Sequence, residues 1–585
     1  MLKFINNLKQ VSAIVTCLAG ITIYGSCDNK KHDTEKETPG AVEDFIATAG
    51  NSQVYLAWNP PSTNGSSAIT GYEVTMNNWT DRENKTASQL SHTYTDLANG
   101  TQYTFKVRAV NAQGAGEESV QTATPTAGSA QPSGDGNVGP RSNTHDDPAN
   151  GIYVSPNGND TTATGSVNAP YKSINTALAA ASPGATVILR SGTYREGRDV
   201  RVRKSNITIK SAKGEWAIID LTTYNPGNEE HSGVEFYAED NITRGIVTGC
   251  KLQSVEVKGG FYAVSFETKW EWEQVDRSGA SNIIIEDCIL HDSRNDVVKV
   301  KPGCDNITIR YCEIYNSGRE FSGKSDFTTG EYNSEGIDNV NGDGMHVHNN
   351  YIHDICSTGI YAKGGATDVL IENNRIERAY AAGIMVGFDT SPQYFDLSVN
   401  PQYYENIRGI VRNNLIINAG WEGIGLYASK DAQVYNNTVV NAVSGTLKYH
   451  SPIYFGVATQ DYGNPTGCPA NVNPNIHHNI VSQPSTYNNR IIDIRYATGV
   501  YSFGLSALSG NPTMNDNCYY IDGKSATFTD NRPGSKLVNA GLAAWKSHIG
   551  GDTGSLEVNP ALNADYMPAN TQCTEMGITI SLKYE

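Results

Sequence analysis

The sequence predicts an all-β protein in which a right-handed parallel β-helix, a solenoid of stacked coils, follows a small β-sandwich. One short pattern returns at intervals near 24 residues along the second half of the chain, and such a period is the signature of a stacked repeat. Residues 41–126 instead alternate apolar and polar positions between turn-forming clusters, as sandwich strands do. Charged residues are only 18% of the chain and 57 of its 585 residues are glycine, which favours an exported all-β protein over a helical cytosolic enzyme.

The first 27 residues have the features of a bacterial lipoprotein signal. Lys3 and Lys9 precede an apolar stretch, Val11 to Tyr24, that is short for a membrane span, and a Gly-Ser-Cys sequence ends at Cys27. We therefore expect lipidation of Cys27, a polar tether over residues 28–40, and export to the bacterial outer membrane, at the cell surface or in the periplasm. An ordinary cleaved signal with an incidental cysteine is the alternative.

The sandwich segment, residues 41–126, contains "VYLAWNPPSTNG", "ITGYEVTM" and "LANGTQYTFKVRAVNAQGAGEES". These runs resemble a fibronectin type III domain, and the resemblance implies that Trp58 lies in the core and Tyr103 at the tyrosine corner. No aromatic platform for a sugar is evident, so we interpret the domain as a spacer. Residues 127–147 are rich in Gly, Pro, Ser and Asn and are predicted to be a linker.

The solenoid, residues 148–585, is predicted from a ladder position flanked by aliphatic residues, as in "ITIRYCEI" and "VLIENNRI". Aliphatic side chains three places before and two places after the ladder residue should point into the core. Stacked Asn amides should hydrogen-bond between coils, and Cys is a small apolar substitute in that position. The predicted ladder positions are Cys250, Cys288, Cys312, Asn350, Asn374, Asn414, Asn437, Asn479 and Cys518.

Eight cysteines lie beyond the signal region, a number that would ordinarily indicate disulfides in an exported protein. Four of them occupy predicted ladder positions and are interpreted as buried thiols. Pairing of the other four stays open; they are Cys304, Cys356, Cys468 and Cys573.

The open end of the first coil would expose strand edges, and "APYKSINTALAAASPG" is predicted to form an amphipathic helix that caps it. This opening resembles that of many bacterial pectate-lyase-like β-helix proteins, and the segment "GSLEVNPALNADYMPAN" resembles their C-terminal closure.

Acids and lysines cluster where three repeat segments are laid over one another, namely "NDVVKVKPG", "SEGIDNVNG" and "STGIYAKGG". Because adjacent coils are ~4.8 Å apart, the overlay stacks Asp296 on Glu335, with Asp338 on the second coil. Lys301 and Lys363 fall in one column two coils apart. Stacked carboxylates repel unless a cation joins them, and Ca²⁺ takes such oxygen ligands. The structural alternative is that lysines of this sheet simply neutralise the acids.

The same segments resemble polysaccharide lyase family 9, the calcium-dependent pectate and rhamnogalacturonan lyases. The resemblance implies Ca²⁺ bound by Asp296, Glu335 and Asp338, and β-elimination with Lys363 as first choice of base and Lys301 as second. Ser334 stands where the family has a further acid, and a strict overlay puts Tyr361 at the family's lysine position. Substrate binding is expected from Tyr361, Arg294, Trp270 and Trp272.

The formal charge of −17 argues against nucleic-acid binding and implies that an acidic polysaccharide must be held by local cations. We expect the protein to act as a monomer. Three other functions stay open: an alginate or glycosaminoglycan lyase resembling family 6, a β-helix glycoside hydrolase with paired carboxylates, and a non-catalytic glycan-binding surface protein. The fold alone does not choose among them.

Overall fold

The computed structural model describes most of residues 37–584. The ranges left undescribed within it are 51–52, 77, 88, 95–96, 99, 126–135, 224–230, 238–246, 269, 272–273, 276–278, 319–332, 446–449, 459–468 and 499–503. The predicted signal with Cys27, the predicted sugar-binding Trp272, and Cys468 therefore lie outside the described residues. In the part of the chain that is described, no helix is long and apolar enough to cross a bilayer.

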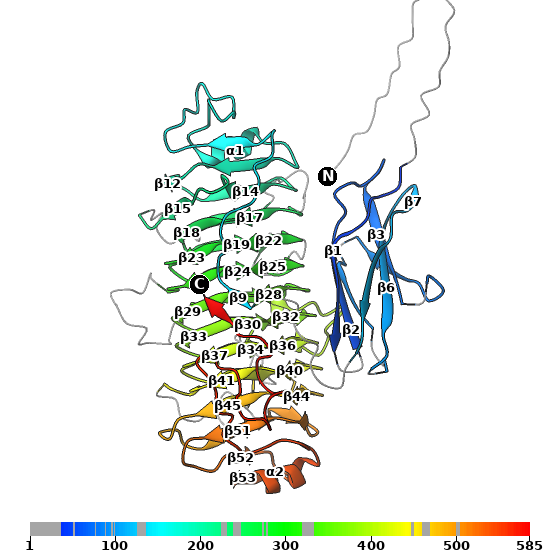
Figure 1. Cartoon of the computed structure of the whole chain (residues 1–585), viewed down its shortest axis with the longest axis vertical. Coiled ribbons are helices and arrows are strands. Elements are labelled where there is room, and N and C mark those ends of the chain that lie inside the picture. The colour runs from blue at the N-terminus through cyan, green and yellow to red at the C-terminus, as the bar shows by residue number, and fades with distance from the viewer. Residues whose placement is uncertain are drawn as a thin grey trace, which may run out of the picture.

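The N-terminal domain is a two-sheet sandwich (Figure 1). Its sheets contain β1 (Glu43–Gly50), β2 (Gln53–Asn59) and β5 (Ser91–Tyr94), and β3 (Ile69–Thr75), β4 (Glu83–Thr86), β6 (Tyr103–Asn111), β7 (Gly114–Ala115) and β8 (Ser119–Ala123). Trp58 is buried against Tyr72, with ring centroids 5.6 Å apart. The Tyr103 hydroxyl accepts the backbone N–H of Ala98 at 3.0 Å, which is the predicted tyrosine corner.

The second domain is a right-handed parallel β-helix whose strands stack into three long sheets, here named sheets A, B and C (Figure 1). Sheet A contains β10 (Ile152–Val154), β11 (Thr186–Leu189), β14 (Thr208–Ser211), β17 (Lys251–Gln253), β22 (Ile283–Glu286), β25 (Ile307–Arg310), β28 (His346–His348), β32 (Leu370–Glu372), β36 (Ile410–Arg412), β40 (Gln433–Tyr435), β44 (Asn475–His477) and β50 (Thr513–Asn515). Sheet B contains β12 (Gly192–Tyr194), β15 (Ala217–Leu221), β18 (Val255–Gly259), β23 (Ile289–His291), β26 (Glu313–Tyr315), β29 (Tyr351–Ile355), β33 (Arg375–Ala379), β37 (Leu415–Ile417), β41 (Thr438–Val440), β45 (Ile480–Gln483) and β51 (Cys518–Ile521).

Sheet C completes each coil and carries the predicted site. It contains β13 (Val200–Val202), β16 (Ser232–Phe236), β19 (Tyr262–Phe266), β24 (Val298–Val300), β27 (Ile337–Val340), β30 (Ile360–Lys363), β34 (Ile384–Val386), β38 (Ile424–Tyr427), β42 (Ile453–Gly456), β46 (Arg490–Ile494), β52 (Thr527–Asp530) and an antiparallel last strand, β53 (Leu537–Ala540). A smaller additional column of short strands contains β31 (Ala366–Thr367), β35 (Asn406–Ile407), β39 (Ser429–Lys430), β43 (Asn471–Val472) and β49 (Leu508–Ser509).

The predicted core columns are confirmed by the strand register. Ile285, Ile309 and Val347 pair in sequence across neighbouring strands of sheet A, and each is fully buried. The column two places after the ladder behaves in the same way on sheet B, where Leu290 pairs with Ile314. Side chains in a strand alternate between faces, so a fixed spacing in the sequence keeps the same face inward in every coil.

The ladder is present, and two of its predicted positions are wrong. Each ladder residue follows a residue with positive φ, as Asn374 follows Asn373 (φ 55°). By this rule the last position is Asn517, after Asp516 (φ 54°), and not Cys518; the Asn479 amide donates to Asn517 Oδ1 at 3.0 Å. The other error is Cys250. Glu256 pairs with Ile289, so the residue level with Cys288 is Val255.

The stacked coils bury the cysteines of the solenoid. All seven that the structure describes are buried thiols, Cys304, Cys356 and Cys573 among them. The Sγ atoms of Cys518 and Cys573 lie 3.2 Å apart in non-bonded contact. The core therefore accommodates these thiols as small apolar groups.

Replacing Asn414 with alanine should destabilise the solenoid by about 3–5 kcal/mol. The buried amide donates to the carbonyls of Ile371 and Arg412 and to Asn437, and it accepts two N–H groups of Asn374. Alanine removes both the donor and the acceptor of this amide, so each of these buried groups loses a hydrogen bond. Urea unfolding would measure the loss, with Asn157→Ala at an exposed turn as the control. Equal unfolding midpoints for the two variants would contradict the ladder's role.

Both ends of the solenoid are capped. Helix α1 (Ile174–Ala180) lies across the first coil as predicted, and the Asn175 amide donates to Asp199 O and accepts the N–H of Arg201 on the edge strand β13. At the other end, α2 (Leu542–Ile549) buries Trp545 against Phe528, with ring centroids 5.4 Å apart. The edge strands that would invite association are thus covered.

Two segments run along the outside of the turn between sheets A and B. The first, residues 136–147, bonds to the turn through the Arg141–Asp287 ion pair at 2.7 Å and through Gly139 N to Asn349 O at 3.0 Å. The second, residues 577–584, reaches the same turn where Thr579 N donates to Asn413 Oδ1. They meet where β9 (Asn137–Val138) pairs with β54 (Lys583–Tyr584), about half-way along the stack (Figure 1). We call them the linker strap and the tail strap.

Candidate active site

The outward face of sheet C carries two columns of side chains that match the predicted overlay. In the first, Lys299 pairs with Asp338, which pairs with Tyr361. In the second, Val340 pairs with Lys363, and Lys301 falls one place beyond the Val300–Asn339 pair. The inward side chains of these strands are buried, and all of them except Asn339 are aliphatic. The solenoid therefore holds these outward side chains on a rigid sheet, which forms the floor of the site.

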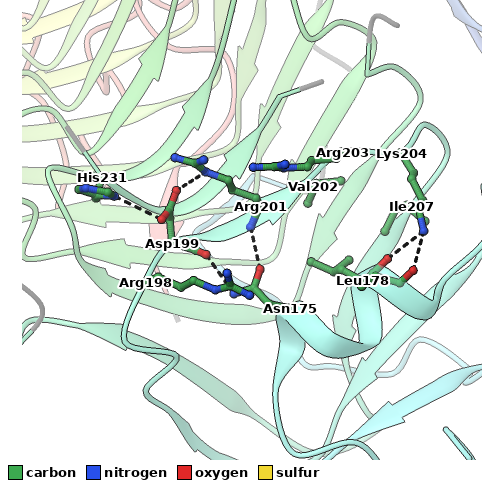
Figure 2. A pocket seen from close by; sticks show the side chains of 11 residues that line it. Asn175, Leu178, Arg198, Asp199, Arg201, Val202, Arg203, Lys204, Ile207 and His231 are labelled. Carbon is green, nitrogen blue, oxygen red and sulfur yellow. Dashed lines mark hydrogen bonds and ion pairs between the residues drawn. The ribbon is translucent and has the colours of Figure 1, made fainter. Parts of the chain in front are cut away.

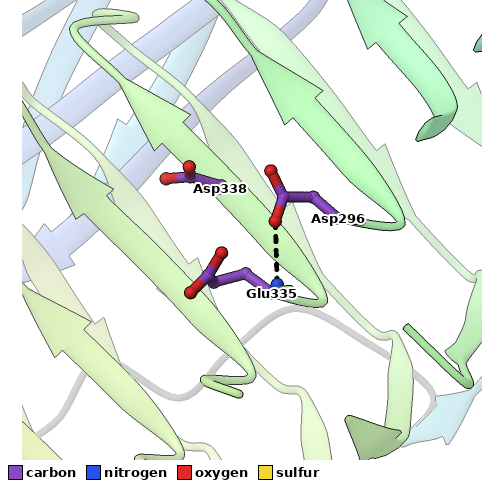
Figure 3. A group of neighbouring side chains, drawn as sticks. All are labelled: Asp296, Glu335 and Asp338. Carbon is purple, nitrogen blue, oxygen red and sulfur yellow. Dashed lines mark hydrogen bonds between the residues drawn. The ribbon is translucent and has the colours of Figure 1, made fainter. Parts of the chain in front are cut away.

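Three carboxylates converge on this floor: Asp296, Glu335 and Asp338, here named the acidic triad (Figure 3). Asp296 and Glu335 lie at the start of neighbouring strands, and the backbone N–H of Glu335 donates to Asp296 Oδ1 at 2.8 Å. One carboxylate oxygen from each residue lies within 4.8 Å of the others, and each residue is at most 1% exposed. Buried like charges at this spacing require compensation by cations or protons.

Two lysines supply part of that compensation. Lys299 Nζ lies 3.1 Å from Asp296 Oδ2 and also contacts Asp338 Oδ2. Lys363 Nζ lies 3.6 Å from Asp338 Oδ1. Lys301 is engaged elsewhere, because its Nζ pairs with Glu267 at 2.7 Å. Three carboxylates thus face two ammonium groups, which leaves the cluster one positive charge short.

The pKa shifts follow from this arrangement. Burial, reinforced by the charges of Asp296 and Asp338, raises the pKa of Glu335 well above its usual range. Burial acts in the same direction on Asp338, but the Lys299 and Lys363 ammonium groups outweigh it and lower that pKa. For Lys363, burial favours the neutral amine, yet the carboxylates of Asp338 and Glu335 outweigh it and raise the pKa. The two lysines therefore stabilise the charged form of Asp338 but not that of Glu335.

The triad fits a hard divalent cation. Glu335 Oε2 and Asp338 Oδ1 are buried and have no hydrogen-bond donor among the described residues, and neither has the hydroxyl of Ser334 beside them in sequence. Ser357 Oγ holds the other Glu335 oxygen at 3.0 Å. Buried polar atoms are ordinarily satisfied, and carboxylate oxygens are the ligands that Ca²⁺ takes.

Glu405 supports the end of the strand that carries Lys363, and sequence reasoning did not find it. Gly364 and Gly365 follow the lysine with φ of 73° and 94°, a turn that side-chain-bearing residues rarely adopt. The buried Glu405 carboxyl accepts the N–H of Gly364 at 2.9 Å and the hydroxyl of Thr390 at 2.6 Å. Burial raises the pKa of Glu405 to about 8. No repeat position marked this residue in advance.

A second buried acid on the same sheet, Glu422, was also missed. Its Oε2 lies 2.6 Å from His450 Nδ1, and its Oε1 accepts the Tyr427 hydroxyl at 2.6 Å. The strand overlay could have found Glu422, because Ile337, Ile360, Ile384 and Ile424 pair in sequence and put it in the column of Glu335. His450 precedes the next strand of the sheet and carried no such signal.

The predicted substrate-binding residues are dispersed. Tyr361 is only 3% exposed, because its ring packs on Phe388 at 5.4 Å and under Lys363 Nζ at 4.6 Å. Arg294 is half-buried, with its guanidinium carbon 6.0 Å from the Phe261 ring centroid. Trp270 lies in a short hairpin of β20 (Trp270–Glu271) and β21 (Gln274–Val275).

Each of the two folded units matches a known protein family. Residues 40–125 match the fibronectin type III domain, and residues 205–458 match the right-handed β-helix region. The chain has a fibronectin type III domain and a right-handed β-helix. Residues 156–202, which include α1, match a family described only as a protein of unknown function.

Curated relatives match over short stretches. Pectate lyase PEL9 of Emericella nidulans is 36% identical over 101 residues, which is 16% of this chain and 23% of that protein. The striated-muscle M-protein of Gallus gallus is 38% identical over 87 residues, 14% of this chain and 6% of the relative. This chain thus spans less than a quarter of the length of either relative.

Solved structures match this chain at low identity and with TM-scores below 0.5. Pectate lyase Pel9A is 15% identical, with 71% of this chain and 81% of that chain covered and a TM-score of 0.34. The family 28 exopolygalacturonase of Yersinia enterocolitica is 12% identical, with 84% and 96% covered and a TM-score of 0.32. The endo-xylogalacturonan hydrolase of Aspergillus tubingensis is 11% identical, with 68% and 100% covered and a TM-score of 0.40. Likenesses this distant do not distinguish one reaction from another.

Proposed function

We propose that the chain degrades a uronate-containing, pectic polysaccharide by β-elimination, with Ca²⁺ on the acidic triad and Lys363 as the base. The observation that carries this proposal is the convergence of three buried carboxylates and a lysine on one outward floor. The 36% identity to a pectate lyase over 101 residues supports the pectic substrate.

Each residue of the site has a separate role in the proposed reaction. Bound Ca²⁺ would neutralise the uronate carboxylate and so make the neighbouring C5 proton more acidic. Lys363 is 8% exposed and lies at the edge of the triad. In its neutral form it would accept that proton, while water would protonate the leaving 4-oxygen. Lys299 holds Asp296 and Asp338 in one orientation through its two contacts. Lys301, held by Glu267, is the weaker choice of base.

A glycoside hydrolase that uses the same carboxylates is the alternative. Glycoside hydrolases use an acid and a second carboxylate flanking the glycosidic bond, about 5–5.5 Å apart in retaining enzymes and about 6.5–9.5 Å apart in inverting ones. In the triad, one oxygen from each of three carboxylates lies within 4.8 Å of the others. That arrangement suits a shared cation better than an acid–base pair.

The proposal is tested by identifying the product of the reaction. The protein would be incubated with homogalacturonan, rhamnogalacturonan, alginate and chondroitin, with calcium and with chelator. Calcium-dependent ultraviolet absorbance from an unsaturated uronate, on a pectic substrate, is the expected result. New reducing ends without that absorbance would show hydrolysis and overturn the lyase assignment.

We also propose that the protein is exported as a monomer, lipidated at Cys27 and held at the outer membrane, where a polysaccharide substrate is available. Metabolic labelling with a fatty acid in a bacterial host should mark the wild type. Cys27→Ser should lose the label and move the protein to the soluble fraction. Labelling that survives the substitution would contradict the anchor.

A further inference from the structure

A second site candidate lies at the first coil, apart from the acidic triad. A cavity of about 620 Å³ opens between α1 and the edge strand β13 (Figure 2). Helix α1 contributes Asn175 and Leu178 to its lining. The strand side contributes Arg198, Arg201, Arg203 and Lys204.

The lining is strongly cationic in a protein of net charge −17. Four basic side chains face one acid, Asp199. One of the four has a structural task, because Lys204 Nζ donates to the carbonyls of Leu178, Ala179 and Ala181 at the end of α1. A second, Arg201, is ion-paired with Asp199 and Glu235. Guanidinium groups such as those of Arg198 and Arg203 bind carboxylate in a bidentate fashion.

Arg201 is held in place by a built network. Its Nε donates to Asp199 Oδ2 at 2.5 Å and to Glu235 Oε2 at 2.8 Å, and both acids are less than 10% exposed. His231 contacts the other oxygen of Asp199 at 3.2 Å (Figure 2). Arg203 follows the last residue of β13 and also lines the cavity. Arg198 and Arg203 are exposed to solvent.

The cavity shares a face with the acidic triad. Arg201 pairs with Glu235, which pairs with Ser265, which pairs with Lys299, so the two sites stand three coils apart in one column. Three coils at ~4.8 Å correspond to ~14 Å. The acids between them, Glu235 and Glu267, are ion-paired with Arg201 and Lys301. A polyanionic chain lying along the sheet therefore meets no uncompensated negative charge from those two acids.

We propose that this first-coil cavity binds a carboxylate-bearing sugar unit of the acidic polysaccharide, as a cationic subsite three coils from the triad. The inference rests on the proposed function for the identity of its ligand. It adds that substrates long enough to reach from the triad to the cavity bind more tightly than short ones.

The test compares Arg198→Gln/Arg203→Gln with wild type in the full chain; Arg201 is kept because its loss would leave Asp199 and Glu235 buried without their cation. Arg195→Gln is the matched control, since Arg195 is exposed but pairs with Asp220 of sheet B. Binding of long and short oligogalacturonates is measured by calorimetry in a Lys363→Gln background, which prevents turnover. The double variant should bind the long oligomer with about tenfold lower affinity than wild type. The control should bind it with the affinity of wild type.

The outcomes separate the two proposals. Equal affinities for the double variant and the control would overturn the subsite. Competition by millimolar sulfate as effective as by oligogalacturonate would also overturn it, because the cavity would then bind small anions generally. Binding that depends on both arginines, in a protein that shows no β-elimination, would uphold the subsite and reject the lyase. In an active enzyme the double variant should raise KM for long substrates and leave kcat unchanged.

Discussion

Lys363→Met should lower kcat for β-elimination by about 10²–10⁴-fold and leave the fold intact. The side chain stands at the edge of the triad, where it is the one lysine of the described site not bridging two acids or engaged by Glu267. Its removal leaves Asp338 still paired with Lys299. Initial rates of unsaturated-uronate formation at saturating substrate would measure the effect, and circular dichroism would check the fold.

The matched control is Lys301→Met. Lys301 lies in the same outward column two coils away, so its substitution removes the same charge and length of side chain from the same face. Its ion pair with Glu267 predicts little loss of kcat. An inactive Lys301 variant beside an active Lys363 variant would reverse the assignment of the base.

Calcium should raise the thermal unfolding midpoint of the wild type, and Asp338→Asn should abolish most of that increment. A ligand that binds only the native state adds RT ln(1 + [L]/Kd), or about 2.7 kcal/mol at a hundredfold excess over Kd. Asp338 contributes a buried oxygen that lacks a hydrogen-bond donor among the described residues. The increment on adding calcium, rather than the absolute midpoint, is the readout, because the substitution also changes the balance with Lys299 and Lys363.

Asp343→Asn is the control for the calcium experiment. This acid follows the same strand but lies outside the triad, hydrogen-bonded to Thr367 N at 2.7 Å. Burial raises its pKa to about 7, so the substitution removes a poorly stabilised charge without touching the proposed ligands. The calcium increment should survive. An equal increment in wild type, Asp338→Asn and Asp343→Asn would exclude the triad as the binding site.

The core was predictable because one spacing governs it. Ile285, Ile309 and Val347 recur at positions that a stacked coil must bury, and the same spacing correctly predicts that Asp296 lies over Glu335. The ladder errors at Cys250 and Cys518 have different local causes. Cys518 lies one place beyond Asn517, which directly follows the left-handed Asp516. Cys250 also follows a left-handed residue, Gly249 (φ 69°), but that turn precedes sheet A, whereas the ladder turn lies between sheets A and B.

The missed site features depend on contacts that the repeat does not encode. The partner of Glu422 is His450, which lies 28 residues further along the chain at the start of the next coil. Tyr361 is covered because Phe388, just beyond the following strand, folds over it. The spacing of the strands predicts which residues share a column, but not which side chain from a neighbouring loop will lie on top.

The two straps should change the way in which this solenoid unfolds. In a one-dimensional stack each repeat interacts only with its neighbours, so the boundary between folded and unfolded coils can move inward one repeat at a time. Here residues 136–147 and 577–584 run along opposite halves of the stack and join at β9 and β54. Unfolding that begins at either end must therefore break the contacts of one strap, and the two straps are joined by the β9–β54 pairing near the middle of the stack. Amide hydrogen exchange should accordingly show outer and central coils opening together, and a chain ending before residue 577 should lose that uniformity first in the half that the tail strap covers.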